Sequence, residues 1–355
     1  MKTRFFCITV FVCFVFITGI TPFVESASIM QDTWKNKMSN AEEKDTLPLF
    51  APVARPGTLL FVGDIMLARA VESRMKKSGM RYPFEALEST LSSPDATIGN
   101  FEGVVSKVHY PTPNYTFQFS VEPVYLAHLK TVGFDVLSLA NNHALDYGKA
   151  SLTHTRTLCE EYGLICGGDP KGLTEKSIKV VEVGTHHVGI LFVHTLFGAP
   201  ASNTLRASIT ELNQQSDIQV AYVHWGEEYE LIHNDVQEEL AKTLIDEGID
   251  VVIGHHPHVV QDVELYKDKP IFYSLGNFVF DQFFSKNVQE MLGVHMKIDK
   301  AEITYTLMPF SSVDTESQPH HADEMTASGL RERILSNLGN DSHVDVTFGT
   351  ITVPR

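Results

Sequence analysis

The chain is short of cysteine, and this limits the sites that it can build. It has four cysteines in 355 residues, and Cys7 and Cys13 lie in an apolar stretch near the N-terminus. Because the remaining pair, Cys159 and Cys166, has no second pair beside it, a thiolate metal site is not expected. Outside the cytoplasm the spacing of these two residues permits a disulfide, but it permits free thiols equally well.

Positive charge is also scarce. The chain has 28 Lys and Arg against 44 Asp and Glu, which gives a formal net charge of −16. This balance argues against nucleic-acid binding, which depends on cationic contacts to phosphates. It also disfavours electrostatic attachment to anionic lipids. A protein of this charge that binds a polyanion needs a local positive centre, and metal ions can supply one.

The N-terminus carries an apolar run over residues 5–20, preceded by Lys2 and Arg4. This layout is typical of a secretory signal peptide. The run is shorter than the roughly 20 residues of a membrane span, but nearby apolar residues could extend it. We therefore expect residues 1–27 to be a signal peptide or an N-terminal membrane anchor. The protein is accordingly expected to be exported to the cell surface, either membrane-anchored or secreted.

The rest of the chain divides into three parts by composition. Residues 28–56 are polar and end in a proline-bearing stretch, which is typical of a linker. Residues 57–310 alternate apolar runs with helical patterns and are expected to fold as one domain. Residues 311–355 are more polar and are expected to form a surface tail. No internal repeat is present, so the domain is not a solenoid.

The alternation of strands and helices predicts an α/β fold with much of its sheet buried on both faces. The segments expected to be strands are residues 59–62, 96–98, 134–139, 220–223, 251–253, 271–274 and 294–298, with a hairpin over 180–193. Helical patterns occupy residues 67–77, 124–132, 148–162 and 236–247.

Five of these strands run directly into residue types that bind metals. These residues are Asp64, Glu102, Asn142, His224 and the pair His256 and His258. In an open α/β sheet the carboxyl ends of the strands border one crevice, so residues far apart in sequence can meet there. Carboxylate, amide and imidazole ligands together suit Mn, Zn or Fe. The pattern predicts a site for two divalent metal ions.

Each of these residues also has an ordinary explanation when it is taken alone. Asp64 and Asn142 are common turn residues, and His224 is compatible with a core histidine. The His-Pro-His run is harder to explain in this way, because Pro257 fixes the backbone between two imidazoles. Their joint occurrence at five strand ends favours the metal site.

The motifs at these positions resemble those of the CapA/PgsA family, the capsule (poly-γ-glutamate) biosynthesis proteins. This family is regarded as a branch of the calcineurin-like metallophosphoesterases. The matching segments occur in order between about residues 58 and 282, and they are Gly63-Asp64-Ile65-Met66, Asn100-Phe101-Glu102, Ala140-Asn141-Asn142-His143 with Asp146 and Gly148, His224-Trp225-Gly226 with Glu228-Tyr229, Gly254 to Val259, and Ser274 to Phe278 with Asp281-Gln282.

The resemblance implies a four-layer α/β/β/α sandwich of metallophosphoesterase type and a role for each site residue. It implies that Asp64 and His258 hold one metal, that Asn142, His224 and His256 hold the other, and that Glu102 bridges the two. It implies that His143 donates a proton to a leaving oxygen, a task that suits an imidazole because it titrates near neutrality.

Two departures separate the chain from ordinary metallophosphoesterases. Those enzymes usually carry Asp-x-His on the first strand, whereas the third position here is Met66, and a thioether is a poor ligand for such ions. Their second motif is Gly-Asp, whereas Gly99 is followed here by Asn100, with the carboxylate at Glu102. Both changes fit the CapA branch and argue against generic phosphatase activity.

Several further residues are expected to support the site. Asn100, Glu228 and Tyr229 are expected to bind substrate or to orient the ligands. Arg69 either contacts an anionic substrate or is an exposed helix charge. The remaining residues have structural expectations: Asn277, Asp281 and Gln282 brace loops, His255 is a spectator, His186 and His187 belong to a hairpin turn, and His320 and His321 lie in the solvated tail.

Three functions remain open on the sequence alone. The first is an extracytoplasmic hydrolase that uses two metals on an anionic polymer or phosphoester during capsule synthesis. The second is a non-catalytic subunit of a membrane synthase or export complex, with a structural or polymer-binding metal site. The third is a secreted phosphoesterase or nucleotidase.

Overall fold

The computed structural model describes residues 55–114, 116–338 and 341–355. The expected signal peptide or anchor over residues 1–27, and all but the last two residues of the expected linker, lie outside these ranges. Within the described ranges, no helix combines the length and the apolar character that crossing a bilayer requires.

The larger sheet contains ten strands in the described residues, in the order β15-β16-β13-β12-β1-β2-β3-β4, with β11 paired to β1 and β14 paired to β13. One half is parallel and comprises β1 (Gly57–Ile65), β2 (Ala96–Phe101), β3 (Val136–Ser138) and β4 (Ile165–Gly167). The other half is antiparallel and comprises β12 (Glu290–Ile298), β13 (Glu302–Ser311), β15 (Val344–Asp345) and β16 (Thr350–Pro354). The two short additional strands are β11 (Asn277–Val279) and β14 (His320–His321).

The smaller sheet contains six strands in the order β5-β6-β7-β8-β10-β9. The four middle strands are parallel, and antiparallel β5 and β9 close the two edges. Its members are β5 (Ile178–Val183), β6 (His186–His194), β7 (Ile218–His224), β8 (Val251–His255), β9 (Val263–Tyr266) and β10 (Lys269–Phe272).

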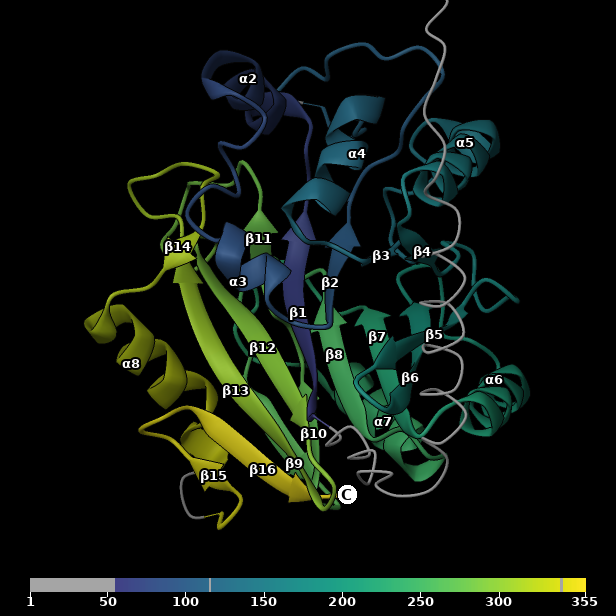
Figure 1. Cartoon of the computed structure of the whole chain (residues 1–355), viewed down its shortest axis with the longest axis vertical. Helices are drawn as coiled ribbons and strands as arrows, with labels where there is room; N and C mark the ends of the chain where they lie inside the picture. The colour runs from purple at the N-terminus through teal and green to yellow at the C-terminus, as the bar shows by residue number, and fades with distance from the viewer. Residues whose placement is uncertain (1–54, 115, 339–340) are drawn as a thin grey trace, which may run out of the picture. The chain divides into compact units, whose positions relative to one another are not determined.

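The two sheets pack face to face, and helices cover their outer faces (Figure 1). Alternate residues of β1 show the arrangement, because Phe61 belongs to the core between the sheets and Val62 to the core under the helices. In β7, Tyr222 and Val223 divide in the same way. Strands buried on both faces need continuous apolar runs, which is the pattern in the sequence. The predicted four-layer α/β/β/α sandwich is confirmed.

The helices divide between the two outer layers. The core on the larger sheet includes side chains of α2 (Arg69–Ser78), α3 (Glu88–Ser92), α4 (Pro123–Val132) and α5 (Gly148–Glu161). The core on the smaller sheet includes side chains of α6 (Ser202–Gln215) and α7 (Asp235–Asp246). Cys159 of α5 and Cys166 of β4 form a disulfide, which the sequence left open.

Residues 311–355 differ from the expected surface tail. They contain α8 (Glu324–Ile334), a 3₁₀ turn (Ser336–Leu338) and β16, and β16 pairs with β13 along its length. Ile334 and Ile351 are fully buried in the core between the sheets. The expectation was wrong because the few apolar residues of this polar segment are spaced to face the core, with Ile351 and Val353 alternating with threonines in β16.

This arrangement predicts that β16 contributes strongly to stability. Ile351→Ala should lower the free energy of unfolding by about 2–5 kcal/mol, because it leaves a cavity in the core. Thr350→Ala, at the neighbouring half-buried position, should cost about 1 kcal/mol or less. Urea unfolding of the two variants measures the difference, and a loss below about 1 kcal/mol for Ile351→Ala would contradict the packing.

Candidate metal centre

The predicted metal ligands lie together at the carboxyl ends of the parallel strands of both sheets. Asp64 is the last residue but one of β1, and Glu102 directly follows β2. Asn142 lies in the loop after β3, His224 ends β7, and His256 and His258 follow β8. The two sheets therefore contribute to one cluster, as the strand-end pattern predicts.

Two glycines allow the strands to approach closely at this edge. A Cβ on Gly63 would lie 1.9 Å from the carbonyl oxygen of Gly276, and a Cβ on Gly254 would lie 2.0 Å from that of Tyr273. No other residue fits these positions without moving the backbone. The backbone N–H of Asp64 also donates to Gly276 O at 3.0 Å. The Gly-Asp motif and the glycine of the Gly-His-His-Pro-His motif thus have a packing role beside the site.

The two carboxylates are joined by one amide. Asp64 and Glu102 have no exposed surface, and Asn100 Nδ2 lies 2.8 Å from Asp64 Oδ1 and 3.2 Å from Glu102 Oε1. Asn141 Nδ2 donates to Asn100 Oδ1 at 3.0 Å, which fixes the direction of the Asn100 amide. Asn100 therefore supports the ligands rather than lying at the rim of the site.

The histidines contact these groups directly. His258 Nδ1 lies 3.2 Å from Asp64 Oδ2, and His224 Nε2 lies 2.9 Å from Asn142 Oδ1. The ring of His256 is 4.7 Å from that of His224, centroid to centroid. His256 and His258 have φ angles of 98° and 58°. Such values are strained for residues with a side chain and cluster at functional sites.

In the part of the chain that the structure describes, the two buried carboxylates of the cluster have no Lys or Arg side chain beside them to balance their charge. In the described residues, no Lys or Arg lies within 4.0 Å of the Asp64 or Glu102 carboxylates. Burial, and then repulsion from Asp64, raise the pKa of Glu102 well above its usual value. Burial alone would raise the pKa of Asp64, but the hydrogen bond and charge of His258 outweigh it and lower that pKa.

The imidazoles of His256 and His224 do not supply the missing charge at neutral pH. Burial, and then nearby His258, lower the pKa of His256 to about 3, and burial lowers the pKa of His224 well below its usual value. Glu102 Oε2 and His256 Nδ1 are buried and have no hydrogen-bond partner. Neutral imidazoles, buried carboxylates and unused lone pairs are the donor set that a divalent cation fits.

At these strand ends, two groups of three residues have ligand atoms within 4.8 Å of one another. One group is Asp64, Glu102 and His224, and the other is Glu228, His256 and His258. Asn142 adjoins the first group through its contact with His224. The structure thus brings all six predicted ligands together and adds Glu228, which was expected to bind substrate or to orient the ligands. How the six divide between two ions stays a prediction.

His143 is positioned beside the carboxylates. Its Nδ1 lies 2.9 Å from Asp146 Oδ2, and its Nε2 lies 4.0 Å from Glu102 Oε2. Phe119 stacks on the imidazole at 4.1 Å between centroids, and the Phe119 N–H donates to Asp146 Oδ2 at 2.7 Å. The side chain is thus held with Nε2 facing the ligand cluster, as a proton donor at the site requires.

Arg69 differs from one of its two expectations, because it is not an exposed helix charge. It is buried, pairs with Asp281, and lies over the Phe119 ring with its Cζ 4.7 Å from the centroid. Its Nη1 lies 3.4 Å from Thr116 O. Through Phe119, which stacks on His143, these contacts help to hold the His143 ring in place. Contact of Arg69 with a substrate stays a prediction.

Other residues around the cluster act as supports. Asn277 Oδ1 lies 3.0 Å from His258 Nδ1, and Asn277 Nδ2 donates to Gln282 Oε1 at 3.1 Å. Gln282 Nε2 donates in turn to the Tyr229 hydroxyl at 3.1 Å. His255 is buried with its ring 4.0 Å from that of Tyr222, and burial lowers its pKa to about 4. Asn277 therefore braces a predicted ligand and not only a loop.

Sequence reasoning missed His194, the last residue of β6. It is buried, its Nδ1 lies 2.7 Å from Pro170 O, and its ring is 5.5 Å from that of His224. Its Nε2 has no partner. The signal was present, because an apolar strand runs into this histidine as into His224, but the strand was interpreted only as half of a hairpin.

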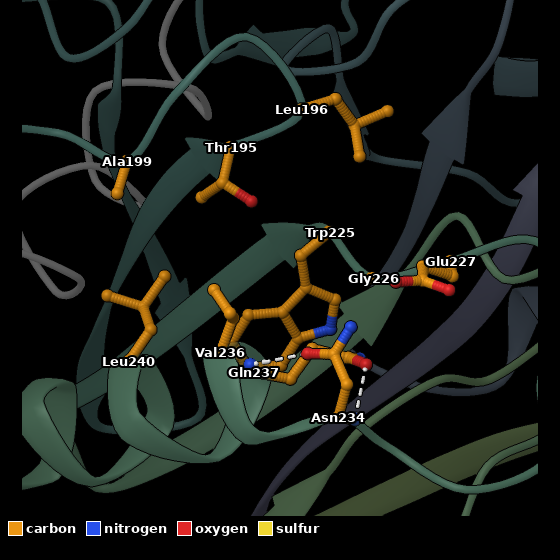
Figure 2. Close-up of a pocket in the computed structure, with 10 residues that line it drawn as sticks. All are labelled: Thr195, Leu196, Ala199, Trp225, Gly226, Glu227, Asn234, Val236, Gln237 and Leu240. Atoms are coloured by element: carbon orange, nitrogen blue, oxygen red, sulfur yellow. Dashed lines mark hydrogen bonds between the residues drawn. The ribbon is translucent and has the colours of Figure 1, made fainter.

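A separate cavity of about 220 Å³ lies on the helix side of the smaller sheet (Figure 2). Trp225, directly after His224, lies between Thr195 and Leu196 on one side and Asn234 and Gln237 on the other. Glu227 also lines this cavity, whereas its neighbour Glu228 belongs to the histidine group. The two adjacent glutamates therefore have different surroundings.

Comparison with known proteins identifies the family. The model of the family described as "Bacterial capsule synthesis protein PGA_cap" matches residues 58–282, which include every predicted ligand. The chain belongs to this family. It is 35% identical over 299 residues to the PGA biosynthesis protein CapA of Bacillus subtilis, covering 80% of this chain and 78% of the relative. It is 31% identical over 307 residues to the capsule biosynthesis protein CapA of Bacillus anthracis, covering 80% and 73%.

More distant proteins are also similar to this chain. A probable polyglutamine synthesis accessory protein of Mycobacterium tuberculosis is 24% identical over 249 residues, which cover 62% of this chain and 65% of the relative. Among solved structures, a novel phosphatase from Mycoplasma pneumoniae covers 77% of this chain and 96% of its own, with a TM-score of 0.46 and 13% identity. That structural likeness carries no conclusion about activity.

The electrostatics of the cluster predict that Glu102 destabilises the metal-free protein. Its pKa is raised in the folded state, so stability falls as pH rises above the pKa of the unfolded chain, where only the unfolded state loses the proton. In EDTA at pH 7, Glu102→Gln should therefore stabilise the protein, by about 1–3 kcal/mol.

With Mn²⁺ or Zn²⁺ in excess, wild type should be more stable than Glu102→Gln, because metal binding stabilises the wild-type protein more than the variant. Urea unfolding at pH 5 and pH 7, with and without metal, measures both effects. A variant that is less stable than wild type in EDTA at both pH values would contradict the predicted shift.

Proposed function

We propose that this member of the capsule synthesis family is an extracytoplasmic hydrolase that holds two divalent metal ions and acts on an anionic substrate in capsule or poly-γ-glutamate synthesis. The observation that carries the proposal is the position of His143. A structural metal site has no need of an imidazole held against a carboxylate, with its second nitrogen 4.0 Å from the buried Glu102.

The chain's own residues have distinct parts in such a reaction. Divalent ions bound by the cluster supply Lewis acidity and a more acidic water. Asp146 accepts from Nδ1 of His143 and fixes the ring, which leaves Nε2 to hold the proton that the leaving oxygen requires. Phe119 covers one face of the imidazole and excludes water from it.

Export is part of the proposal. It is supported by the charged and apolar layout of residues 1–27 and by the Cys159–Cys166 disulfide, since disulfides persist in oxidising compartments. The negative charge of the whole chain would repel an anionic polymer, so the bound cations would provide the local attraction that the surface lacks.

A second candidate is a non-catalytic subunit of a membrane synthase or export complex. Met66 favours it, since this residue removes a ligand that active metallophosphoesterases usually have. The name of the Mycobacterium tuberculosis relative, an accessory protein, favours it as well. On this alternative the metal site stabilises the fold or binds polymer, and His143 is dispensable.

A comparison of three variants separates the two candidates. His143→Gln should keep the metal content and the melting temperature but lower turnover by about 10²–10⁴-fold. Asp64→Asn should lose metal and activity together, and His187→Gln, at an exposed position on β6, should match wild type. Hydrolysis of poly-γ-glutamate and of a panel of phosphate esters by the purified protein measures turnover, and polymer production is measured in cells that depend on this chain.

The outcomes are distinct. Normal polymer production with His143→Gln, together with failure of Asp64→Asn, would contradict catalysis and support the accessory role. Hydrolysis of a phosphate ester, without effect on polymer, would point instead to a secreted phosphoesterase. A wild-type chain that binds no metal would contradict both of the leading candidates.

A further inference from the structure

Met66 stands where metallophosphoesterases usually carry a histidine ligand, two residues after Asp64, and its surroundings show why it does not bind metal. Met66 has no exposed surface and packs in the core beneath the helices of the larger sheet. Its sulfur accepts a hydrogen bond from the Ala68 N–H at 3.1 Å. The thioether is therefore occupied in the protein interior, and the position that follows Asp64 by two residues is closed to metal binding.

The loop after β7 is tied to the turn that carries the histidine ligands. The Tyr229 N–H donates to Pro257 O, between His256 and His258, at 2.8 Å. Tyr229 has a φ of 70°, a strained value for a residue with a side chain, and its hydroxyl accepts from Gln282 at 3.1 Å. The backbone directly after Glu228 is thus fixed relative to the His-Pro-His turn.

The side chain of Glu228 lies against the same histidines. One carboxylate oxygen of Glu228 and one nitrogen of each of His256 and His258 all lie within 4.8 Å of one another. No ion pair within 4.0 Å joins Glu228 to a Lys, Arg or His among the residues that the structure describes. His256 is 7% exposed, and its Nδ1 has no hydrogen-bond partner. A carboxylate oxygen and one nitrogen of each of two buried imidazoles therefore adjoin one space.

We propose that Glu228 is itself a metal ligand, which binds a divalent cation together with His258 or His256 in place of the ligand that Met66 does not provide. The inference rests on the proposed metal site and deepens it. A carboxylate oxygen is a better donor than a thioether for Mn²⁺, Zn²⁺ or Fe²⁺. Because Glu228 is exposed whereas Asp64 and Glu102 are buried, it is the ligand on the solvent side of the cluster.

Glu227 provides a matched control. It is the neighbouring glutamate and is also exposed, but it lines the cavity beside Trp225 and is not part of the histidine group (Figure 2). Glu227→Gln and Glu228→Gln remove the same charge from the same loop. A general effect of negative charge on cation binding should therefore appear equally in both variants, whereas coordination should appear in one.

The test is metal binding by the full-length protein in mild detergent, after treatment with EDTA. Titration with Mn²⁺ and Zn²⁺ by calorimetry, and equilibrium dialysis followed by elemental analysis, give affinity and stoichiometry. We expect Glu228→Gln to weaken one of two bound equivalents by about 10–100-fold or more. Glu227→Gln should equal wild type, and Glu228→Asp should retain part of the affinity. Substitution with Co²⁺ adds a spectroscopic measure, since the intensity of the visible bands changes with the donor set.

The possible results separate this inference from the function on which it rests. Equal melting temperatures in EDTA show that the variants are folded. If wild type and Glu228→Gln then bind both equivalents with the same affinity and the same Co²⁺ spectrum, Glu228 is not a ligand, although the metal site stands. If wild type binds no metal, the proposed function itself fails.

Discussion

The concentration of two buried carboxylates around one amide is the constraint on which the rest of this site depends. Asp64 and Glu102 are both fully buried and share the Nδ2 group of Asn100. Two negative charges cannot persist together in a dry environment unless a cation or a proton neutralises one of them. Burial lowers the pKa of both His224 and His256, so these two imidazoles stay neutral and can bind a cation but cannot replace it. Contacts around the cluster fix the positions of these groups. Asn141 orients the Asn100 amide, and the backbone N–H of His256 in the His-Pro-His turn donates to Asp64.

The fold brings the predicted ligands to one edge of the two sheets, and unusual backbone geometry at a few residues lets their side chains approach one another. Parallel strands of two sheets end at one edge, which brings together residues nearly 200 positions apart in the chain, as the contact between Asp64 and His258 shows. Gly63 and Gly254 allow the strands to approach each other at backbone distance. The positive φ angles of His256 and His258 cost free energy, and the surrounding packing must offset that cost.

Most of the sandwich and the members of the cluster were predictable from the sequence, because strands buried on both faces give continuous apolar runs and their ends are marked by polar residues. The prediction failed where this signal is weak. In the C-terminal segment the core residues, such as Ile351, are surrounded in sequence by polar residues. The sequences of α6 and β13 mix apolar and polar residues without a clear period, so no helix or strand was predicted there. The histidine at the end of β6 was passed over because its strand was interpreted as a hairpin. Burial of Arg69 against Asp281 and Phe119 depends on contacts more than 40 residues apart, which no local pattern encodes.

The central claim, that the strand ends hold two divalent cations, is tested most directly by X-ray crystallography of the full-length protein grown with Mn²⁺. Anomalous diffraction locates the ions independently of any activity. The account predicts two peaks about 3.5–4 Å apart, with Glu102 between them and His224 and His258 on opposite ions. An ordered cluster without an anomalous peak, at a Mn²⁺ concentration that saturates binding in solution, would contradict it.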